Sequence, residues 1–276
     1  SRPLDQVLAE VRLLASDGVK EVELLGQTIN AYRCPDSGAD LAQLLEKVAS
    51  VDGLLRVRFI TSHPRHFDQD LIDVLASHRN VFRYLHLPIQ SGSDEILKRM
   101  HRKYTRQEYL DLVGRIRKAA PEINLSTDII VGFPGETEAD FEDTMELLEE
   151  VRFGQVFAFG FSPRPKTPAA RYRPQISDAV KSARLQRLFG RCDEISRELN
   201  HALVGRSIQV LIDGPSRRDP EHWQGRGEDN RVVNFPRCGR EEIGDVVEVE
   251  IRRAGAHSLV GMIVGGAVRL PTVSNG

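Results

Sequence analysis

The segment GFPGE at 132–136 follows an apolar segment at 123–131 and has the composition of a ligand-binding turn. Glycine tolerates positive φ and has no side chain, so the backbone of such a turn can approach a ligand closely. Glu136 can also cap the helix that follows and interact with its positive end. The segment therefore fits two interpretations equally, a ligand site and a tight strand-to-helix turn.

Polar side chains also follow the other predicted strands, where each strand gives way to a loop. They are Gln27, Asn30, Ser62, Gln90 and Ser91. Loops at the carboxyl ends of strands carry the chemistry in a TIM-like barrel, although loops are polar in most proteins. A Gln side chain supplies a carbonyl acceptor for an ammonium group. Ser91 or Ser93 can instead cap the helix that contains Ile96.

The segment 225–235 combines positive charge, amides and an aromatic ring. It contains Arg226, Asn230, Arg231, Asn234 and Phe235. Such a mixture suits single-stranded RNA, whose phosphates, base edges and base faces these side chains can bind respectively. The alternative is structural, with Phe235 in a core and Asn230 in a turn. Arg164, in a proline-rich loop, could similarly hold a phosphate or a carboxylate, or lie in solvent.

Three cysteines, Cys34, Cys192 and Cys238, lie far apart in the sequence. An odd and sparse set argues against a disulfide framework and for a reducing compartment, so we expect a cytoplasmic protein. The sequence has no CxxC and no Cys/His cluster, and its local spacing therefore predicts no metal site.

The length of 276 residues suits one large domain, or one large domain with a small one. The chain is 40% hydrophobic and 28% charged, which excludes collagen, a disordered tail and a disulfide scaffold. No apolar run approaches the roughly 18 residues that a membrane helix needs. Two runs, 97–118 and 163–191, each hold eight Lys and Arg residues. These runs are consistent with a polyanionic partner such as a nucleic acid. The simpler interpretation is that they are the charged faces of surface helices.

Five segments with strand character alternate with helical segments in the first 200 residues. They are 19–25, 55–60, 82–87, 123–131 and 155–161. This alternation predicts βαβ crossovers and a parallel sheet. The strands could form a barrel or an open doubly wound sheet. No GxGxxG follows the first strand, which disfavours a dinucleotide-binding fold. The polar residues after the strand ends favour a partial TIM-like (β/α) barrel over residues 1–203. Because the chain opens on a helix with no strand before it, we expect a further βα element in the parent protein.

After residue 203 the pattern changes to short alternating strands at 207–212, 246–251 and 258–264. Glycines and a Gly-Pro pair lie between them as turn signals. We therefore expect an α/β fold in which the (β/α) barrel is followed by a small antiparallel β-barrel over 204–270. The second barrel is similar to an oligonucleotide-binding (OB) barrel. Residues 271–276 are expected to form a tail.

Four ordered motifs resemble the radical-SAM methylthiotransferases. They are LLGQTINAY at 24–32, HLPIQSGSD at 86–94 with MHRKYT at 100–105, TDIIVGFPGET at 127–137 and FSPRPKTPAA at 161–170. The fourth motif has Lys166 where the family usually has glycine. The last 70 residues resemble the TRAM domain, an RNA-binding β-barrel, and 225–235 resembles the tRNA-modifying branch rather than the ribosomal-protein branch.

The resemblance implies S-adenosylmethionine (SAM) as a cofactor, bound at the strand ends. The residues that it assigns to this cofactor are Gln27, Asn30, Ser62, Gln90, Ser91, Asp128, Gly132, Pro134 and Glu136. It also implies two 4Fe–4S clusters in the parent protein, one of them held by a CxxxCxxC loop that this sequence lacks. No cysteine of this chain matches a cluster ligand, so we expect no catalytic or metal-ligating residue here and no activity from the chain alone.

For the parent protein, the resemblance implies transfer of a methylthio group to C2 of isopentenylated adenosine at position 37 of tRNA. The partner would be a tRNA anticodon stem-loop, bound through Arg164 and the residues of 225–235. The protein would be a monomer and would not associate with a membrane. The sulfur donor stays open. Alternatives within the class are a threonylcarbamoyladenosine in tRNA or a ribosomal-protein aspartate. An alternative from another class is a non-catalytic RNA-binding module.

Overall fold

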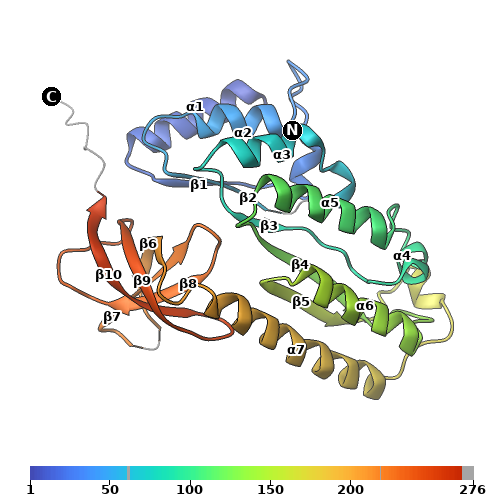
Figure 1. Cartoon of the computed structure of the whole chain (residues 1–276). Helices are drawn as coiled ribbons and strands as arrows, with labels where there is room; N and C mark the ends of the chain where they lie inside the picture. The colour runs from blue at the N-terminus through green and yellow to red at the C-terminus, as the bar shows by residue number, and fades with distance from the viewer. Residues whose placement is uncertain (61–62, 218, 269–276) are drawn as a thin grey trace.

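The structure is a computed structural model that describes residues 1–60, 63–217 and 219–268 (Figure 1). Its first part alternates helices with short strands. The helices are α1 (Leu4–Ser16), α2 (Leu41–Ala49), α3 (Gln69–Ser77), α4 (Asp94–Arg99), α5 (Arg106–Ala119), α6 (Glu138–Val151) and α7 (Asp178–His201). The strands are β1 (Glu21–Leu24), β2 (Arg56–Phe59), β3 (Tyr84–His86), β4 (Asn124–Val131) and β5 (Gln155–Gly160). In the part of the chain that is described, no helix is long and apolar enough to cross a membrane.

These five strands form two parallel sheets, one of β1 and β2 and one of β3, β4 and β5. β1 pairs with β2, and β4 lies between β3 and β5. An isolated parallel bridge between Val57 and Val81 joins the two groups of strands. A parallel sheet with a helix between successive strands is the partial TIM-like barrel that the sequence predicts. In a parallel sheet all carboxyl ends lie at one edge, so the loops after β1, β3 and β4 are brought to the same side.

The helices pack on the sheet through fully buried aliphatic and aromatic side chains. Leu45 of α2, Ile72 of α3, Ile116 of α5 and Phe141 of α6 have no exposed surface. Burial of each such side chain stabilises the fold by about 1.5–3 kcal/mol. In Figure 1, α1, α2, α3 and α5 lie along one side of the strands. The opposite side carries the polar and aromatic residues described below.

The C-terminal part is a closed five-stranded barrel. Its strands are β6 (Ser207–Pro215), β7 (His222–Gly227), β8 (Val232–Pro236), β9 (Val246–Ala254) and β10 (Leu259–Val268). They close in the order β10-β8-β7-β6-β9. All pairs are antiparallel except β10 with β8. This barrel confirms the OB-like prediction, and residues such as Val210, Val249 and Leu259 fill its core.

The sequence predicts three strands in this barrel, and the structure adds β7 and β8. Gly225 and Gly227 resemble turn signals in the sequence, but both lie inside β7. A Cβ on Gly225 would collide with the carbonyl oxygen of Leu211 and would lie 2.6 Å from Cγ1 of Val210. Glycine inside a strand often marks such a close approach of two backbones, and here it permits β6 and β7 to pair.

Candidate cofactor site and RNA interface

The turn after β4 is covered on two sides by basic side chains. Gly132 has a φ of 74° and Gly135 a φ of 87°, conformations that favour glycine. A Cβ on Gly132 would lie 2.8 Å from Cδ of Lys181, and one on Gly135 would lie 2.8 Å from Cζ of Arg99. Arg99 also donates from Nε to the carbonyl oxygen of Pro134 at 3.0 Å. These contacts explain why glycine occupies both positions, because a larger residue would not fit in this tight strand-to-helix turn.

Glu136 fixes this turn to α7. Its side chain is buried, and its carboxylate accepts from the N–H of Gly132 at 2.6 Å and from Nη1 of Arg184 at 2.7 Å. Burial raises the pKa of Glu136, and these two donors oppose the shift. The prediction that Glu136 caps the next helix is wrong. Thr137 is the N-cap of α6 and forms a capping box with Asp140, because its side chain reaches the free N–H groups of the first turn.

Gln90, in the loop after β3, has an unusual backbone conformation. Its φ is 79°, in the region that side chains other than glycine rarely adopt. Its N–H donates to the carbonyl oxygen of Asp128 at 2.9 Å, and its own carbonyl accepts from Ile130 at 2.9 Å. The backbone of Gln90 therefore lies beside the carboxyl half of β4, close to the predicted cofactor residue Asp128.

The serines that follow have structural partners. Ser93 is the N-cap of α4 and accepts from the N–H of Ile96 at 3.4 Å, which confirms the capping alternative for this residue. The hydroxyl of Ser91 is buried and accepts from the N–H of Ser93 at 3.2 Å. Ser91 thus shapes the loop from within.

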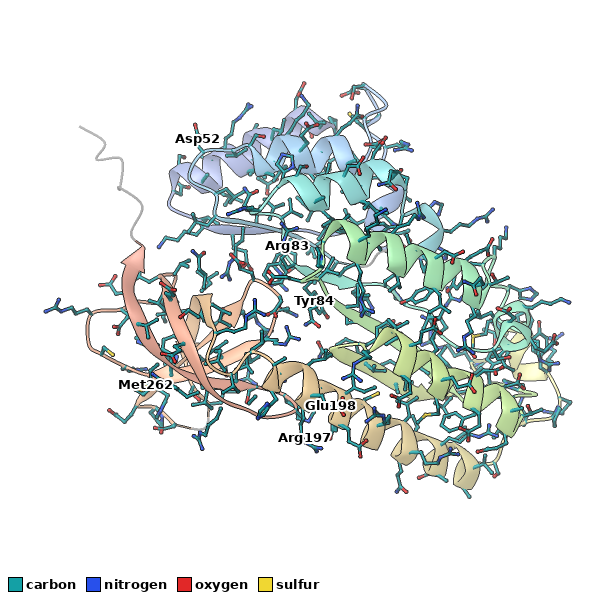
Figure 2. The ribbon with its side chains drawn as sticks, in the orientation of Figure 1. Asp52, Arg83, Tyr84, Arg197, Glu198 and Met262 are labelled. Atoms are coloured by element: carbon teal, nitrogen blue, oxygen red, sulfur yellow. The ribbon has the colours of Figure 1, made fainter. Side chains whose placement is uncertain are left out.

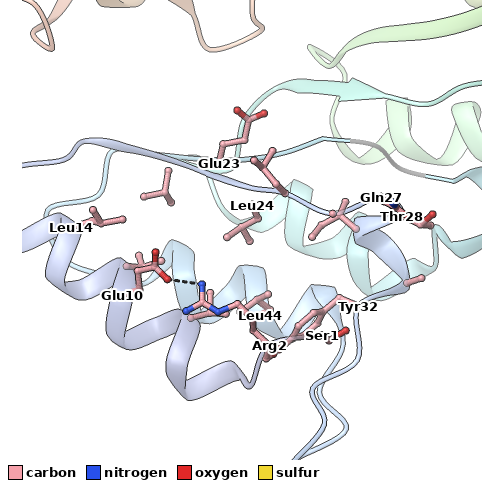
Figure 3. A pocket seen from close by; sticks show the side chains of 17 residues that line it. Ser1, Arg2, Glu10, Leu14, Glu23, Leu24, Gln27, Thr28, Tyr32 and Leu44 are labelled. Atoms are coloured by element: carbon pink, nitrogen blue, oxygen red, sulfur yellow. Dashed lines mark hydrogen bonds and ion pairs between the residues drawn. The ribbon is translucent and has the colours of Figure 1, made fainter.

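Gln27 and Asn30 both follow β1 but have different environments. Asn30 is buried, and its amide exchanges two hydrogen bonds with the backbone of His63, at 2.8 and 2.9 Å. It therefore ties two loops of the carboxyl edge together. Gln27 is exposed and lines a cavity of about 480 Å³ beside α1 (Figure 3). Ser62 lies outside the described residues.

On the side of the sheet away from α2 and α3, the predicted residue Asp128 belongs to a cluster whose other members sequence reasoning missed. Nδ1 of His86 lies 2.9 Å from Oγ of Ser126, and Nε2 of His86 lies 3.4 Å from Oδ2 of Asp128. Phe157 packs edge-on against His86, with ring centroids 5.8 Å apart. Phe157 is 39% exposed and Phe159 57% exposed. The signal in the sequence is the alternation of Ser126 with Asp128 and of Phe157 with Phe159, which places each pair on one face of its strand.

The turn between β7 and β8 docks on the amino-terminal ends of the parallel strands. Oδ1 of Asn230 accepts from Nη2 of Arg58, on β2, at 3.2 Å. Nδ2 of Asn124, on β4, donates to the carbonyl oxygen of Asp229 at 2.9 Å. Asn230 has a φ of 68°, a conformation that asparagine adopts more readily than most residues. The side chain of Asn230 therefore joins the two parts of the chain.

The two arginines of this segment have protein partners. Nε of Arg226 lies 3.4 Å from Oδ2 of Asp213, and its Nη1 donates to Oδ1 of Asn230 at 3.2 Å. Arg231 pairs with Asp229 and donates from Nε to Oδ1 of Asn200, at the end of α7, at 2.6 Å. The predicted RNA residues 226, 230 and 231 thus lie at the interface between the barrels, where both guanidinium groups and Oδ1 of Asn230 have protein partners.

Phe235 is fully buried in the core of the C-terminal barrel. The prediction that its ring stacks on RNA is wrong, and the structural alternative holds because the ring is needed to fill the barrel. Asn234, which precedes it on β8, is half-buried, and Arg164 is exposed. Lys166 has a φ of 69°, so this loop keeps the left-handed conformation that a glycine adopts without strain.

A comparison with protein families matches residues 1–148 to the Radical SAM superfamily. The chain belongs to the radical SAM superfamily. The same comparison matches residues 201–264 of this radical SAM protein to the TRAM domain. Both matches agree with the family resemblance drawn from the motifs.

Two similar proteins carry the name tRNA-2-methylthio-N(6)-dimethylallyladenosine synthase. The radical SAM chain is 47% identical over 272 residues to the protein of Burkholderia thailandensis and 48% identical over 268 residues to that of Alkalilimnicola ehrlichii. Each alignment covers 96% of this chain and 60% of the relative. The chain therefore spans about 60% of the length of these relatives.

A solved radical SAM enzyme supports the fold. Coproporphyrinogen III oxidase from Escherichia coli superposes with a TM-score of 0.50 at 16% sequence identity. The superposition covers 70% of this chain and 46% of that enzyme. At this identity the likeness concerns the arrangement of strands and helices.

Membership of the superfamily implies SAM and a 4Fe–4S cluster as cofactors, and the described residues do not fit a cluster. Cys34 is buried, Cys192 lies within α7 and Cys238 is exposed after β8. A hydrogen bond from Ser37 lowers the pKa of Cys34 to about 7, whereas burial raises the pKa of Cys192 to about 12. Over the residues that the structure describes, no group of three His, Cys, Asp or Glu side chains could hold a metal ion.

The residues at the carboxyl edge fit SAM better. Gln27 is exposed and the Asp128 side chain is 32% exposed, so both can offer oxygen acceptors to hydroxyl and ammonium groups. The backbone at Gln90 and the turn at 132–136 lie at the same edge. The oxygen acceptors of Gln27 and Asp128 suit the ammonium group of SAM, and the basic side chains of Lys181 and Arg99 lie beside the turn at 132–136.

Proposed function

We propose that this chain provides the radical SAM barrel and the TRAM barrel of a tRNA methylthiotransferase. The proposed reaction adds a methylthio group to C2 of N6-isopentenyladenosine at position 37. The observation that carries the proposal is the identity of about 47% over 96% of the chain to synthases that bear this name. The pairing of the two domains in one chain supports it.

The residues proposed for SAM divide into direct and supporting groups. Gln27 and Asp128 are proposed to contact the cofactor with side-chain oxygens, and Gln90 with its strained backbone. Gly132, Pro134 and Glu136, with Asn30 and Ser91, are proposed to shape the loops around it. Ser62, outside the described residues, stays a proposed cofactor residue. With a cluster, one SAM molecule would supply the 5′-deoxyadenosyl radical that activates the adenine C2–H, and another would supply the methyl group. We propose two 4Fe–4S clusters in the working enzyme, with ligands from outside this chain.

The proposed RNA partner is the anticodon stem-loop of tRNA. The proposal draws its support from the TRAM match and from the tRNA named in the relatives. Arg164 and Asn234 are proposed to contact the RNA directly. Arg226, Asn230 and Arg231 are proposed to act through the interface that holds the barrels together. We propose a monomeric, cytoplasmic enzyme.

Deletion of the gene that encodes this chain tests the proposal. Nucleosides from the tRNA of the deletion strain and its parent are compared by mass spectrometry. We expect the 2-methylthio derivative to disappear and isopentenyladenosine to accumulate. Loss of a methylthio group from threonylcarbamoyladenosine, or from a ribosomal-protein aspartate, would instead identify one of the alternative substrates. Unchanged tRNA and ribosomal protein would favour a non-catalytic RNA-binding module.

A further inference from the structure

A cavity of about 410 Å³ lies where β5 and α7 meet the C-terminal barrel. Tyr84 of β3, labelled in Figure 2, contributes an aromatic ring to its wall, as do Phe157 of β5 and Phe189 of α7. The barrel contributes Arg226 and Asn230. Because its walls come from both parts of the chain, the cavity forms only when the barrel is docked.

Two of these rings are open to the cavity and to solvent. Phe157 is 39% exposed and Phe189 44% exposed, although phenylalanine is among the residues most often buried. Ligand sites are concave and lined mainly by apolar and aromatic side chains with a few polar groups, as this cavity is. The volume lies near the lower end of the range for small-molecule sites, about 300–1,000 Å³, and suits a group the size of one nucleoside.

The charges around the cavity favour a neutral ligand. Arg226 already faces Asp213, and Arg231 already pairs with Asp229. A free anion would have to compete with these carboxylates. The amide of Gln155, in the lining, offers a donor and an acceptor to a polar edge. The amide of Asn230 offers Nδ2 as a donor, because its Oδ1 already accepts from Arg58 and Arg226.

We propose that this cavity binds one unstacked base of the RNA. The ring of Phe157 lies against the face of the base, and the amides of Gln155 and Asn230 lie against its edge. Proteins recognise unstacked bases of RNA loops by this combination of aromatic stacking and edge contacts. The inference rests on the proposed function only in taking the RNA to be tRNA. The cavity is at the amino-terminal ends of the strands, so this base is distinct from one that reacts at the carboxyl edge.

Binding of a synthetic anticodon stem-loop to the 276-residue chain tests the inference, measured by fluorescence anisotropy. A series of RNAs lacks one loop base at a time. We expect one of these abasic RNAs to bind on the order of 10-fold more weakly than the intact RNA. Phe157→Ala should weaken binding of the intact RNA by a similar factor and should show no further loss with that abasic RNA.

Phe159→Ala is the matched control. Phe159 lies two residues further along the same strand and is 57% exposed, but it does not line the cavity. Its replacement should leave RNA affinity unchanged. Phe157→Tyr keeps a ring and should retain affinity, and Phe157→Leu replaces Phe157→Ala if the latter fails to fold.

Three results would overturn the inference. The first is equal RNA affinity of the unmutated chain and of Phe157→Ala or Phe157→Leu. The second is that the losses of affinity from Phe157→Ala and from the abasic RNA add up, and the third is that the unmutated chain does not bind the intact RNA. The deletion strain reports on methylthiolation, whereas this comparison reports on binding alone. Failure of the inference is therefore distinguishable from failure of the proposed function.

Discussion

Gly132 holds the turn after β4 in a left-handed conformation directly beneath Lys181. A Cβ at this position would meet the stem of that lysine, 2.8 Å from Cδ, and would also strain the backbone at a φ of 74°. We therefore expect Gly132→Ala to destabilise the protein by about 2–4 kcal/mol, from backbone strain and overpacking together. Chemical denaturation followed by circular dichroism measures the change.

Two companion variants separate these causes. Adding Lys181→Ala to Gly132→Ala should recover the overpacking part and leave about 1–2 kcal/mol of backbone strain. Gly114→Ala, in α5 where nothing lies within 4 Å of the new Cβ, should stabilise the protein by roughly 0.5–1 kcal/mol. Equal effects of Gly132→Ala and Gly114→Ala would show that neither strain nor contact matters at the turn.

Phe235 lies opposite Trp223 in the pairing of β7 with β8. Trp223 is the single tryptophan of the chain, so its fluorescence reports on the C-terminal barrel. We expect Phe235→Ala to destabilise this barrel by about 3–5 kcal/mol and to reduce RNA binding only as far as the barrel unfolds. Asn234→Ala, at the half-buried neighbour, should change stability by less than about 0.5 kcal/mol. A large loss of RNA affinity with unchanged stability of Phe235→Ala would restore the stacking interpretation.

At the scale of elements, periodicity located the five parallel strands but not β7 and β8. The parallel strands are runs of branched and aromatic residues bounded by turn signals, which is a local property. β7 contains Gly225 because its backbone approaches Leu211 on β6, a contact that depends on the closed barrel. The same local composition thus indicates a turn in isolation and a strand in the fold.

The β7–β8 turn is the element that fixes the barrel to the sheet. Asn230→Gly keeps the left-handed backbone and removes the acceptor for Arg58 and Arg226, so we expect a loss of about 2 kcal/mol for hydrogen bonds from charged donors. Asn230→Ala adds backbone strain and should lose about 1 kcal/mol more. Unfolding monitored through Trp223 measures both variants. Identical stabilities of the two would contradict the strained backbone at Asn230.

At the scale of the whole molecule, the motifs identified the carboxyl edge of the sheet but not the interface at its other end. The hydrogen bond between Arg58 and Asn230 joins residues 172 positions apart. Arg58 in a strand and Asn230 before an arginine each have ordinary local explanations, a solvated charge and an RNA contact. Only the docking of the barrels shows that they are partners, and only this docking creates the cavity that Phe157 lines.

The separation of the three cysteines is likewise a property of the whole molecule. Cys34, Cys192 and Cys238 belong to three different regions of the fold and differ in exposure. A 4Fe–4S cluster is normally held by three or four thiolates around one site. The 276-residue chain, reconstituted with iron and sulfide, should therefore hold no stable four-iron cluster. A variant with all three cysteines changed to alanine should retain the same small amount of iron. Iron and sulfide analysis with EPR after reduction measures both. A cluster signal that disappears in the alanine variant would show that the thiols do converge on a common site.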